Sequence, residues 1–291
     1  MPRLVSWNMS HWQKTREQRL QAWDHLRSLK PDFALLQEAV PQDDLPASRC
    51  VFRPGGIGSS RPWGSLVVSF TEDIDAIQRV RGSGRAEFDP HQTYPGALAI
   101  ATTKSGLTLI SLYTVMEHGY AITTLHRQLS DLTPLFDSPQ GRHAILSGDL
   151  NISTQFREPH RTRHANALDR IASLGMVDAL RMNRPPRDPP TQCPCVDRPC
   201  LHVQTQRHPK SATPWQNDYV FVSAALAPNV RACHPIDAGY PWSLSDHCPV
   251  VVELTPPPPP PPTPADSPSS APPSARPRPS PRAAPRSTPP C

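Results

Sequence analysis

Residues 144–151 read Ala-Ile-Leu-Ser-Gly-Asp-Leu-Asn and join an apolar run to a polar turn. The run Ala144-Ile145-Leu146 predicts a short buried strand. Gly148 permits a bend or a close approach of the backbone. Asp149 and Asn151 are two positions apart, so on an extended chain end their side chains would project from the same face. A carboxylate beside an amide suits a site that holds a phosphate while water is activated, although a plain Asp/Asn-rich turn has the same composition.

The stretch 256–291 differs from the rest of the 291-residue chain. Nearly half of its positions are Pro, beginning with seven in a row, and the others are mainly Ala, Ser, Thr and Arg. Such a segment has no apolar face to bury, which predicts a disordered Pro-rich tail that acts as a flexible tether or docks a partner domain. Residues 1–255 suffice for one large domain with a sizeable core.

The formal net charge of +5 is divided between these two parts. Four Arg and one Asp give the tail +3, which leaves +2 for the remaining residues. This balance is far weaker than that of a strongly basic nucleic-acid-binding protein, so any preference for phosphate has to come from a local site. Neither a signal peptide nor an apolar run near the roughly 20 residues of a membrane span is evident, so we expect a cytoplasmic monomer with reduced thiols and no membrane contact.

Apolar periodicity predicts the remaining elements. Apolar spacings of three and four predict helices over 15–29 and 122–136, and a third helix that ends at Gly175. Apolar runs predict strands over 4–8, 33–38, 65–70, 97–102, 107–115, 144–149, 219–223 and 248–254. The Pro/Gly-rich connection before residue 65 and the stretch 183–215 are expected to be loops, and 72–94 is ambiguous. Many strands with a few long helices indicate a layered α/β or α+β domain.

Polar residues stand repeatedly at the ends of these strands. They are Asn8, Glu38, Tyr113, Asp149 with Asn151, Asp218, and Asp246 with His247. Each one alone has an ordinary structural explanation, such as an exposed strand end or a turn. Together, Glu, Asp and His beside strand ends offer the ligands of a hard-cation site and an acid–base pair.

Five segments carry a resemblance to a known family. They are Trp7-Asn8, Leu36-Gln37-Glu38, Gly148-Asp149-Leu150-Asn151, Asp218-Tyr219 and Ser245-Asp246-His247-Cys248-Pro249. In this order and at these separations they resemble the endonuclease/exonuclease/phosphatase superfamily, over residues 4–254. The resemblance implies an α+β, deoxyribonuclease I-like fold with four layers, in which two packed mixed β-sheets are flanked by helices and the site lies at one edge. A catalytic domain at 1–255 would then contain a Cys-rich loop, at 191–215, that the common family pattern lacks.

The resemblance also implies a metal site for Mg²⁺ or Mn²⁺. Glu38 resembles the main Mg²⁺ ligand, with Asn8 close by, and Asp246 resembles a further metal-site or water-linked carboxylate. Mg²⁺ keeps water and substrate phosphate in its coordination shell, so one or two carboxylates suffice. The implied reaction is metal-assisted hydrolysis of a phosphate ester.

The catalytic roles follow from the same resemblance. Asp149 matches the residue that orients or deprotonates the attacking water, and Asn151 matches the amide that holds a phosphate oxygen. His247 matches the histidine that contacts the phosphate, and Asp218 matches its orienting partner. Tyr113 is either a phenol that hydrogen-bonds the phosphate or a buried anchor of its strand end.

These expectations add up to a Mg²⁺-dependent phosphoesterase, and first of all to an endo- or exonuclease that binds nucleic acid. Nuclease activity is common in this fold, and basic residues flank the motifs. The alternative is a phosphatase or phosphodiesterase that acts on a small-molecule or lipid phosphate. A non-catalytic binding protein on the same fold is disfavoured because the strand-end residues are intact.

The Cys-rich loop is a second chemical signal. Cys193, Cys195, Cys200 and His202 lie within ten residues and have the ligand types of a structural Zn²⁺ site. Their C-x-C…C-x-H spacing is tighter than the usual C-x₂-C pair, so reduced cysteines without a metal are the alternative. Basic and aromatic residues follow at Arg207, His208, Lys210 and Trp215. They would contact a phosphate and stack on a base, or form a solvated basic loop.

Overall fold

The computed structural model describes residues 2–55, 62–81, 86–184, 193–195 and 199–255. The described residues all belong to one compact unit. The predicted Pro-rich tail lies outside the described residues, as does part of the predicted Cys-rich loop. Among the described residues, no helix is both long enough and apolar enough to cross a bilayer.

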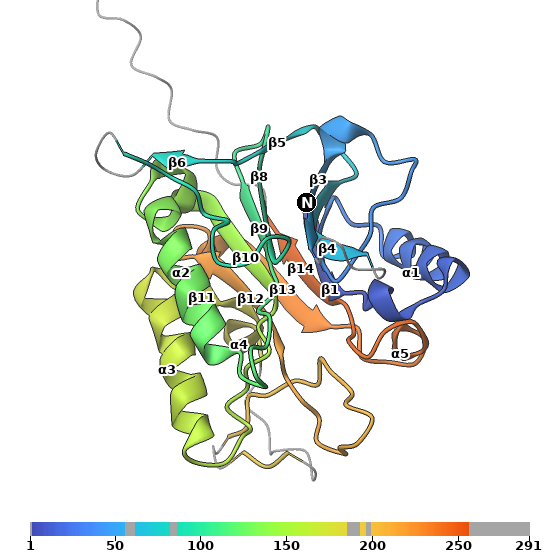
Figure 1. Cartoon of the computed structure of the whole chain (residues 1–291), viewed down its shortest axis with the longest axis vertical. Coiled ribbons are helices and arrows are strands. Elements are labelled where there is room, and N and C mark those ends of the chain that lie inside the picture. Colours follow the sequence, from blue (N-terminus) through green and yellow to red (C-terminus); the bar gives the residue numbers. More distant parts are fainter. Residues whose placement is uncertain (1, 56–61, 82–85, 185–192, 196–198, 256–291) are drawn as a thin grey trace, which may run out of the picture. The chain divides into compact units, whose positions relative to one another are not determined.

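Two six-stranded mixed sheets form the centre of this unit (Figure 1). The first has the order β13-β14-β1-β2-β4-β3 and contains β1 (Arg3–Asn8), β2 (Phe33–Gln37), β3 (Cys50–Gly55), β4 (Trp63–Ser69), β13 (Val230–Pro235) and β14 (Val250–Leu254). The second has the order β11-β12-β10-β9-β8-β5 and contains β5 (Ile74–Ala76), β8 (Leu98–Thr103), β9 (Thr108–Leu112), β10 (Ala144–Asp149), β11 (Met176–Asp178) and β12 (Asp218–Ser223). In each sheet one central pair is parallel, β1 with β2 and β9 with β10, and the flanking pairs are antiparallel.

Helices cover the outer faces of both sheets. The α-helices are α1 (Arg16–Ser28), α2 (Ile122–Phe136), α3 (His160–Ser173), α4 (Ala179–Met182) and α5 (Pro241–Leu244), and the 3₁₀ turns are η1 (His11–Gln13), η2 (Ala47–Arg49), η3 (Pro139–His143) and η4 (Ala227–Asn229). In Figure 1, α1 and α5 lie beside the first sheet, and α2 and α3 lie along the second. A small hairpin of β6 (Val80–Arg81) and β7 (Glu87–Phe88) is separate from both sheets. The predicted four-layer α+β sandwich is confirmed.

Three hydrophobic clusters correspond to the three contacts between these layers. One fills the space between the sheets, one joins the second sheet to α2 and α3, and one joins the first sheet to α1. In β2, Phe33 and Leu35 belong to the cluster between the sheets, whereas Ala34 and Leu36 belong to the cluster under α1. Because alternate side chains point to opposite faces and both faces are covered, the central strands read as unbroken apolar runs.

The helix ends follow the chemistry of the sequence. Thr15 caps α1 with a capping box in which its side chain and that of Gln18 each accept a backbone N–H of the other residue. Gly175, just beyond α3, has φ +79 and gives way directly to β11. Its predicted place at the end of the third helix is confirmed.

Several short elements were not predicted. β3 and β13 are edge strands. β3 contains Arg53 and Pro54 and buries only Val51 and Gly55, so it lacks an apolar run. The ambiguous stretch 72–94 contributes β5, β6 and β7, none longer than three residues. Such elements form because neighbouring strands offer hydrogen bonds, a cause that local periodicity does not reveal.

Candidate active site

The sheet topology brings the predicted strand-end residues to one edge of the sandwich. The carboxyl ends of β1, β2 and β10 lie there, together with the amino ends of their antiparallel neighbours β12 and β14. Asp149 and Asp218 are direct register partners on β10 and β12. Residues far apart in sequence thereby form one polar cluster.

Asp149 is the centre of this cluster and is almost completely buried. Its Oδ2 accepts a hydrogen bond from Asn8 Nδ2 at 3.0 Å, and its Oδ1 accepts one from the backbone N–H of Asn151 at 2.9 Å. Asn8 belongs to the first sheet and Asp149 to the second, so this contact ties the two sheets together at the site. Both oxygens of the carboxylate are therefore held in place.

Gly148 permits this close packing of strands and sheets. Its φ is +152, and a Cβ added there would lie 1.9 Å from the carbonyl oxygen of Leu112 and 2.9 Å from Gln37 Nε2. Gln37 Nε2 donates to Ser111 Oγ at 2.9 Å, and Ser111 Oγ donates to the carbonyl of Leu36 at 2.8 Å. A polar bridge between the sheets thus lies directly under the turn that carries Asp149.

The prediction that Asp149 and Asn151 share one face of an extended chain is wrong. Asn151 is left-handed, with φ +50, and its N–H turns back to the Asp149 carboxylate. Asn tolerates this conformation, and an Asp side chain two residues earlier commonly stabilises such a turn. The Asn151 side chain donates to the carbonyl of Thr114 at 3.0 Å and lines a cavity beside the site.

His247 lies between two carboxylates. Its Nδ1 is 2.8 Å from Asp218 Oδ2, and its Nε2 is 3.7 Å from Asp149 Oδ2. All three side chains are buried, and their ligand-type atoms lie within 4.8 Å of one another. Because a carboxylate oxygen accepts hydrogen bonds, His247 Nδ1 carries the hydrogen and donates it in a hydrogen bond to Asp218.

This arrangement shifts the ionisation of the cluster. Burial lowers the pKa of His247, but the charges of Asp218 and Asp149 outweigh it and raise that pKa to about 10. Burial raises the pKa of Asp149 to about 7. The charge of His247 opposes this rise, and the charge of Asp218 adds to it. Loss of hydration disfavours the charged form of Asp149, whereas the negative charges of Asp149 and Asp218 stabilise the imidazolium form of His247.

The backbone around His247 is fixed by residues of β1 and its own turn. Trp7 Nε1 donates to the carbonyl of His247 at 2.9 Å, and the N–H of His247 donates to Ser245 Oγ at 3.1 Å. Ser245 Oγ in turn donates to the carbonyl of Asn8 at 2.8 Å. The imidazole is therefore positioned through its main chain as well as through Asp218.

Glu38 and Tyr113 form the other side of the cluster. Glu38 follows β2 with φ +46, and its carboxylate accepts a hydrogen bond from Trp12 Nε1. Burial and the charges of Glu38, Asp149 and Asp246 all raise the pKa of Tyr113 far above its usual range. The phenol therefore stays protonated, and its ring packs edge-on against Trp63.

Three supporting residues escaped sequence reasoning. Trp12 contacts Glu38 from 26 positions away, and Gln37 bridges the sheets as described above. Thr205 Oγ1 accepts the backbone N–H of Asp218 at 3.0 Å, and its carbonyl accepts that of Cys248 at 2.9 Å. Thr205 lies in a predicted loop, and nothing in its local sequence signals this role.

A cavity borders the cluster on the side of Asn151. Apolar and aromatic side chains of Met116, Phe156 and Trp215 line it together with His208 and Lys210. The ring centroids of Phe156 and Trp215 lie 4.8 Å apart, and Phe156 is 38% exposed.

Arg207 lies elsewhere, with its guanidinium 4.2 Å from the ring centre of Trp242. Of the four basic and aromatic residues that follow His202 within the Cys-rich loop, the structure therefore places three at the cavity wall.

The cysteines and histidine of the Cys-rich loop also come together. Ligand atoms of Cys193, Cys195, Cys200 and His202 all lie within 4.8 Å of one another. No disulfide forms among the described cysteines. This second cluster is separate from the strand-end residues.

Similar folds occur in several solved structures. An AP endonuclease from Archaeoglobus fulgidus gives a TM-score of 0.60 at 19% identity, covering 87% of this chain and 99% of that chain. The endonuclease domain of TRAS1, a telomere-specific non-LTR retrotransposon, gives 0.58 at 16% identity, with 87% and 98% covered. The 3' phosphatase NExo from Neisseria, bound to product DNA hairpin, gives 0.58 at 18% identity, with 88% and 100% covered. At these identities the likeness establishes the fold.

Comparison of the sequence with curated proteins gives no match. The sequence model of the endonuclease/exonuclease/phosphatase family, however, matches residues 5–247. That range begins in β1 and ends at His247, so it contains the whole strand-end cluster. The chain belongs to the endonuclease/exonuclease/phosphatase family, and it is a hydrolase of phosphodiesters or phosphate esters.

Proposed function

We propose that this protein is a Mg²⁺- or Mn²⁺-dependent nuclease. The observation that carries the proposal is the buried Asp149–His247–Asp218 cluster, beside which Asn151 lines a cavity with aromatic and basic walls. Phosphodiester hydrolysis needs a group to orient water, a donor to the phosphate and a surface that holds the nucleotides. We assign these roles to Asp149, to His247 with Asn151, and to the cavity wall.

The residues on the Glu38 side fit a hard divalent cation. Glu38, Asp246 and Asn8 offer only oxygen donors, which Mg²⁺ and Mn²⁺ prefer. Glu38 is 8% exposed, and among the described residues no Lys or Arg forms an ion pair with Glu38 or Asp246. A buried carboxylate such as that of Glu38 is costly without a positive partner unless a cation compensates it. When bound, the metal would polarise the phosphate and neutralise developing charge.

Asn8 supports the metal side mainly through Asp149. Its Nδ2 donates to Asp149, and its Oδ1 accepts the backbone N–H of Ser10 at 3.0 Å. The Oδ1 atom keeps one further lone pair, which is available to a metal or a metal-bound water. We therefore assign Asn8 first to the orientation of Asp149 and second to the cation.

Asp149 is placed to accept a proton from the attacking water. Hydrogen bonds from Asn8 and Asn151 fix both oxygens of its carboxylate. The water oxygen forms a bond to phosphorus, its proton passes to Asp149, and the bond from phosphorus to the leaving oxygen breaks. Fixing the base in advance lowers the entropic cost of reaching the transition state.

His247 and Asn151 are placed to hold the phosphate. Asp218 fixes the His247 ring through Nδ1, so Nε2 carries a proton toward a non-bridging oxygen. Asn151 uses one amide hydrogen on Thr114 and keeps the other for the substrate. Donors that are already in place stabilise the added negative charge of the transition state.

The neighbouring cavity favours a nucleic-acid substrate over a lipid or a small phosphate. Phe156 and Trp215 offer ring faces for bases, and Lys210 and His208 offer contacts for the backbone. Similar structures include an AP endonuclease, a retrotransposon endonuclease and a 3' phosphatase bound to a DNA product. A 3' phosphatase is the second candidate, because the same groups would hydrolyse a terminal phosphate.

The test is a substrate panel with purified full-length protein and Mg²⁺ or Mn²⁺. The arms are duplex DNA with an abasic site, DNA with a 3' phosphate, a recessed 3' end, single-stranded DNA, RNA, inositol phosphate and sphingomyelin. We expect cleavage of at least one DNA arm, loss of activity with EDTA, and recovery with added Mg²⁺. Hydrolysis of only inositol phosphate or sphingomyelin would overturn the nuclease assignment. Inactivity on every substrate would overturn the proposal that the protein is an active phosphoesterase.

Two variants test the assignment of the site. Asp149→Asn and His247→Ala should each abolish activity while circular dichroism shows an intact fold. As a matched control, Asp178→Asn changes a half-buried aspartate at the end of β11 that caps α4, outside the cluster. Full activity of either site variant would show that the reaction takes place elsewhere.

A further inference from the structure

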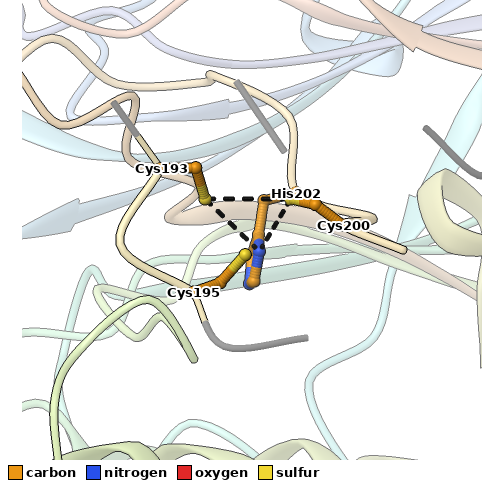
Figure 2. A group of neighbouring side chains, drawn as sticks. All are labelled: Cys193, Cys195, Cys200 and His202. Atoms are coloured by element: carbon orange, nitrogen blue, oxygen red, sulfur yellow. Dashed lines mark hydrogen bonds between the residues drawn. The ribbon is translucent and has the colours of Figure 1, made fainter. Parts of the chain in front are cut away.

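We propose that Cys193, Cys195, Cys200 and His202 form a structural Zn²⁺ site that fixes the segment next to the active site. Figure 2 shows the four side chains converging on one point. Their ligand atoms all lie within 4.8 Å of one another, although the residues come from two stretches of the loop. Three sulfurs and one imidazole are a usual donor set of structural zinc.

The separations match the edges of a zinc tetrahedron. Bonds of about 2.3 Å to sulfur and about 2.05 Å to nitrogen place two sulfurs roughly 3.8 Å apart and a sulfur and a nitrogen roughly 3.6 Å apart. Cys200 Sγ lies 3.7 Å from Cys193 Sγ and 3.6 Å from His202 Nδ1, and Cys193 Sγ lies 3.9 Å from the same nitrogen. A disulfide needs sulfurs about 2.05 Å apart, so this is the spacing of ligands rather than of a bonded pair.

The surrounding hydrogen bonds are those of a metal site. His202 turns Nδ1 toward the sulfurs, and its Nε2 lies 2.7 Å from Thr154 Oγ1. A metal-bound histidine normally uses its second nitrogen in this way, which fixes the ring and its tautomer. Gln155 Nε2 donates to Cys193 Sγ at 3.4 Å, an arrangement that stabilises a negatively charged thiolate.

Gln155 connects the cluster to the active-site loop. Its amide also donates to the carbonyl of Pro214 at 2.8 Å, and its Oε1 accepts the N–H of Gln216 at 2.8 Å. Ser153 and Thr154, which precede it, follow the Asp149–Asn151 turn. Gln155 therefore contacts both the Cys cluster and the segment before β12, and it follows the Asp149–Asn151 turn closely in sequence.

The segment 199–217 has little regular structure of its own. It contains only isolated bridges, in which Gln206 pairs with Trp215 and with His247. Nevertheless it supplies Thr205 to Asp218 and the Lys210 and Trp215 side chains to the cavity. A zinc ion at the beginning of this segment would restrain these residues. The free energy of metal binding would offset the conformational entropy lost when the irregular chain is ordered. The site goes beyond the proposed nuclease activity and does not depend on it.

The first test measures metal in the full-length wild-type protein, purified under reducing conditions without chelators or metal-affinity resin. We expect about one zinc ion per chain. Protein reconstituted with Co²⁺ should show a sulfur-to-cobalt charge-transfer band and the intense visible bands of a tetrahedral ion. Absence of both zinc and the cobalt bands would overturn the proposal, as would a disulfide between two cluster cysteines in the unreduced protein.

Variants locate the metal. Cys200→Ser should lose the zinc, and His202→Cys should keep it because a Cys₄ site also binds zinc. Cys50→Ser is the matched control, because Cys50 lies on β3, outside the cluster. Glu38→Gln should also keep the zinc. Zinc that remains in Cys200→Ser and disappears in Glu38→Gln would belong to the active site and would refute the proposal.

The structural role has its own readout. In Cys200→Ser, amide hydrogen exchange should accelerate in residues 199–217, while the central strands β1 and β10 keep their protection. Wild-type exchange rates throughout this segment, in protein that has lost its zinc, would refute a positioning role. If Cys200→Ser does not fold, wild-type protein treated with a chelator serves for the same comparison.

Discussion

His247 Nδ1 lies 2.8 Å from Asp218 Oδ2, and both side chains are almost completely buried. The other oxygen, Asp218 Oδ1, has no hydrogen-bond partner among the described residues. Asp218 therefore directs its charge mainly at His247, in surroundings where water does not screen it. Orientation of the imidazole is the role that this geometry supports.

Asp218→Asn is predicted to lower kcat by roughly 100- to 10,000-fold with a smaller effect on KM. The amide can donate where the carboxylate only accepts, so it favours the wrong tautomer of His247. Steady-state kinetics on the best DNA substrate measures the change. Asp178→Asn should leave kcat within a few-fold of wild type. An equal loss in both variants would indicate general destabilisation, and no loss in Asp218→Asn would refute the orienting role.

Gly148→Ala is predicted to destabilise the protein by about 3 kcal/mol or more. The new Cβ would lie 1.9 Å from the Leu112 carbonyl, which belongs to the neighbouring strand and cannot move alone. Gly175→Ala is the matched comparison, because Gly175 also has positive φ but nothing lies within 4 Å of its Cβ position. It should cost only about 1 kcal/mol of backbone strain. Urea denaturation measures both, and equal losses would show that the steric contact is unimportant.

Trp215→Ala is predicted to weaken binding of single-stranded DNA by roughly 10-fold or more, because a stacking surface is lost. Hydrolysis of bis-p-nitrophenyl phosphate, which carries no base, should change little. Phe88→Ala is a control, since Phe88 is a 43% exposed aromatic on the β6–β7 hairpin, away from the cavity lining. Fluorescence anisotropy gives the affinities. Unchanged DNA affinity in Trp215→Ala would remove the cavity from the substrate path.

Protein stability is predicted to depend on pH through His164. Its Nδ1 accepts the backbone N–H of Ser153 at 2.9 Å, and burial, followed by the charge of His160, lowers its pKa to about 4. The unfolded chain therefore takes up the proton first as the pH falls. The contribution to the free energy of unfolding is complete above pH 6.5 and is lost progressively between pH 6.5 and about 4.

The measurement is the free energy of unfolding as a function of pH. One proton gives a slope of at most about 1.4 kcal/mol per pH unit, and partial solvation of the ring reduces it. His164→Asn keeps an acceptor for Ser153 but does not titrate, so its stability should fall less steeply in this range. Identical slopes for the two proteins would contradict the prediction.

Much of the fold was predictable because the central strands are buried on both faces. Runs such as Phe33–Gln37 and Ala144–Asp149 have no polar alternation, and this marks them as interior strands. Edge strand β13 was not predictable, since Arg231 and His234 are exposed and interrupt its apolar pattern. Its pairing with β14 depends on hydrogen bonds to a strand some 20 residues later.

The candidate site shows the same division. Glu38, Asp149, Asp218 and His247 were identified because they stand at the ends of recognisable strands. Trp12 and Thr205 were not, because their contacts with Glu38 and Asp218 link segments that are distant in sequence or irregular. The predicted direction of the Asn151 side chain was wrong because the residue is left-handed, and this conformation depends on the Asp149 carboxylate.

The sequence by itself determined where the long central strands lie, which chemical groups stand at their ends, and that three cysteines and a histidine lie close along the chain. These are local properties, set by periodicity and spacing. Only the tertiary structure decided that the Asn8 amide donates to Asp149, that Gly148 leaves room for the Leu112 carbonyl, and that Gln155 joins the Cys cluster to the segment before β12. The physical reason is that these hydrogen bonds and steric contacts depend on how the two sheets pack. That packing results from many weak side-chain contacts throughout the domain.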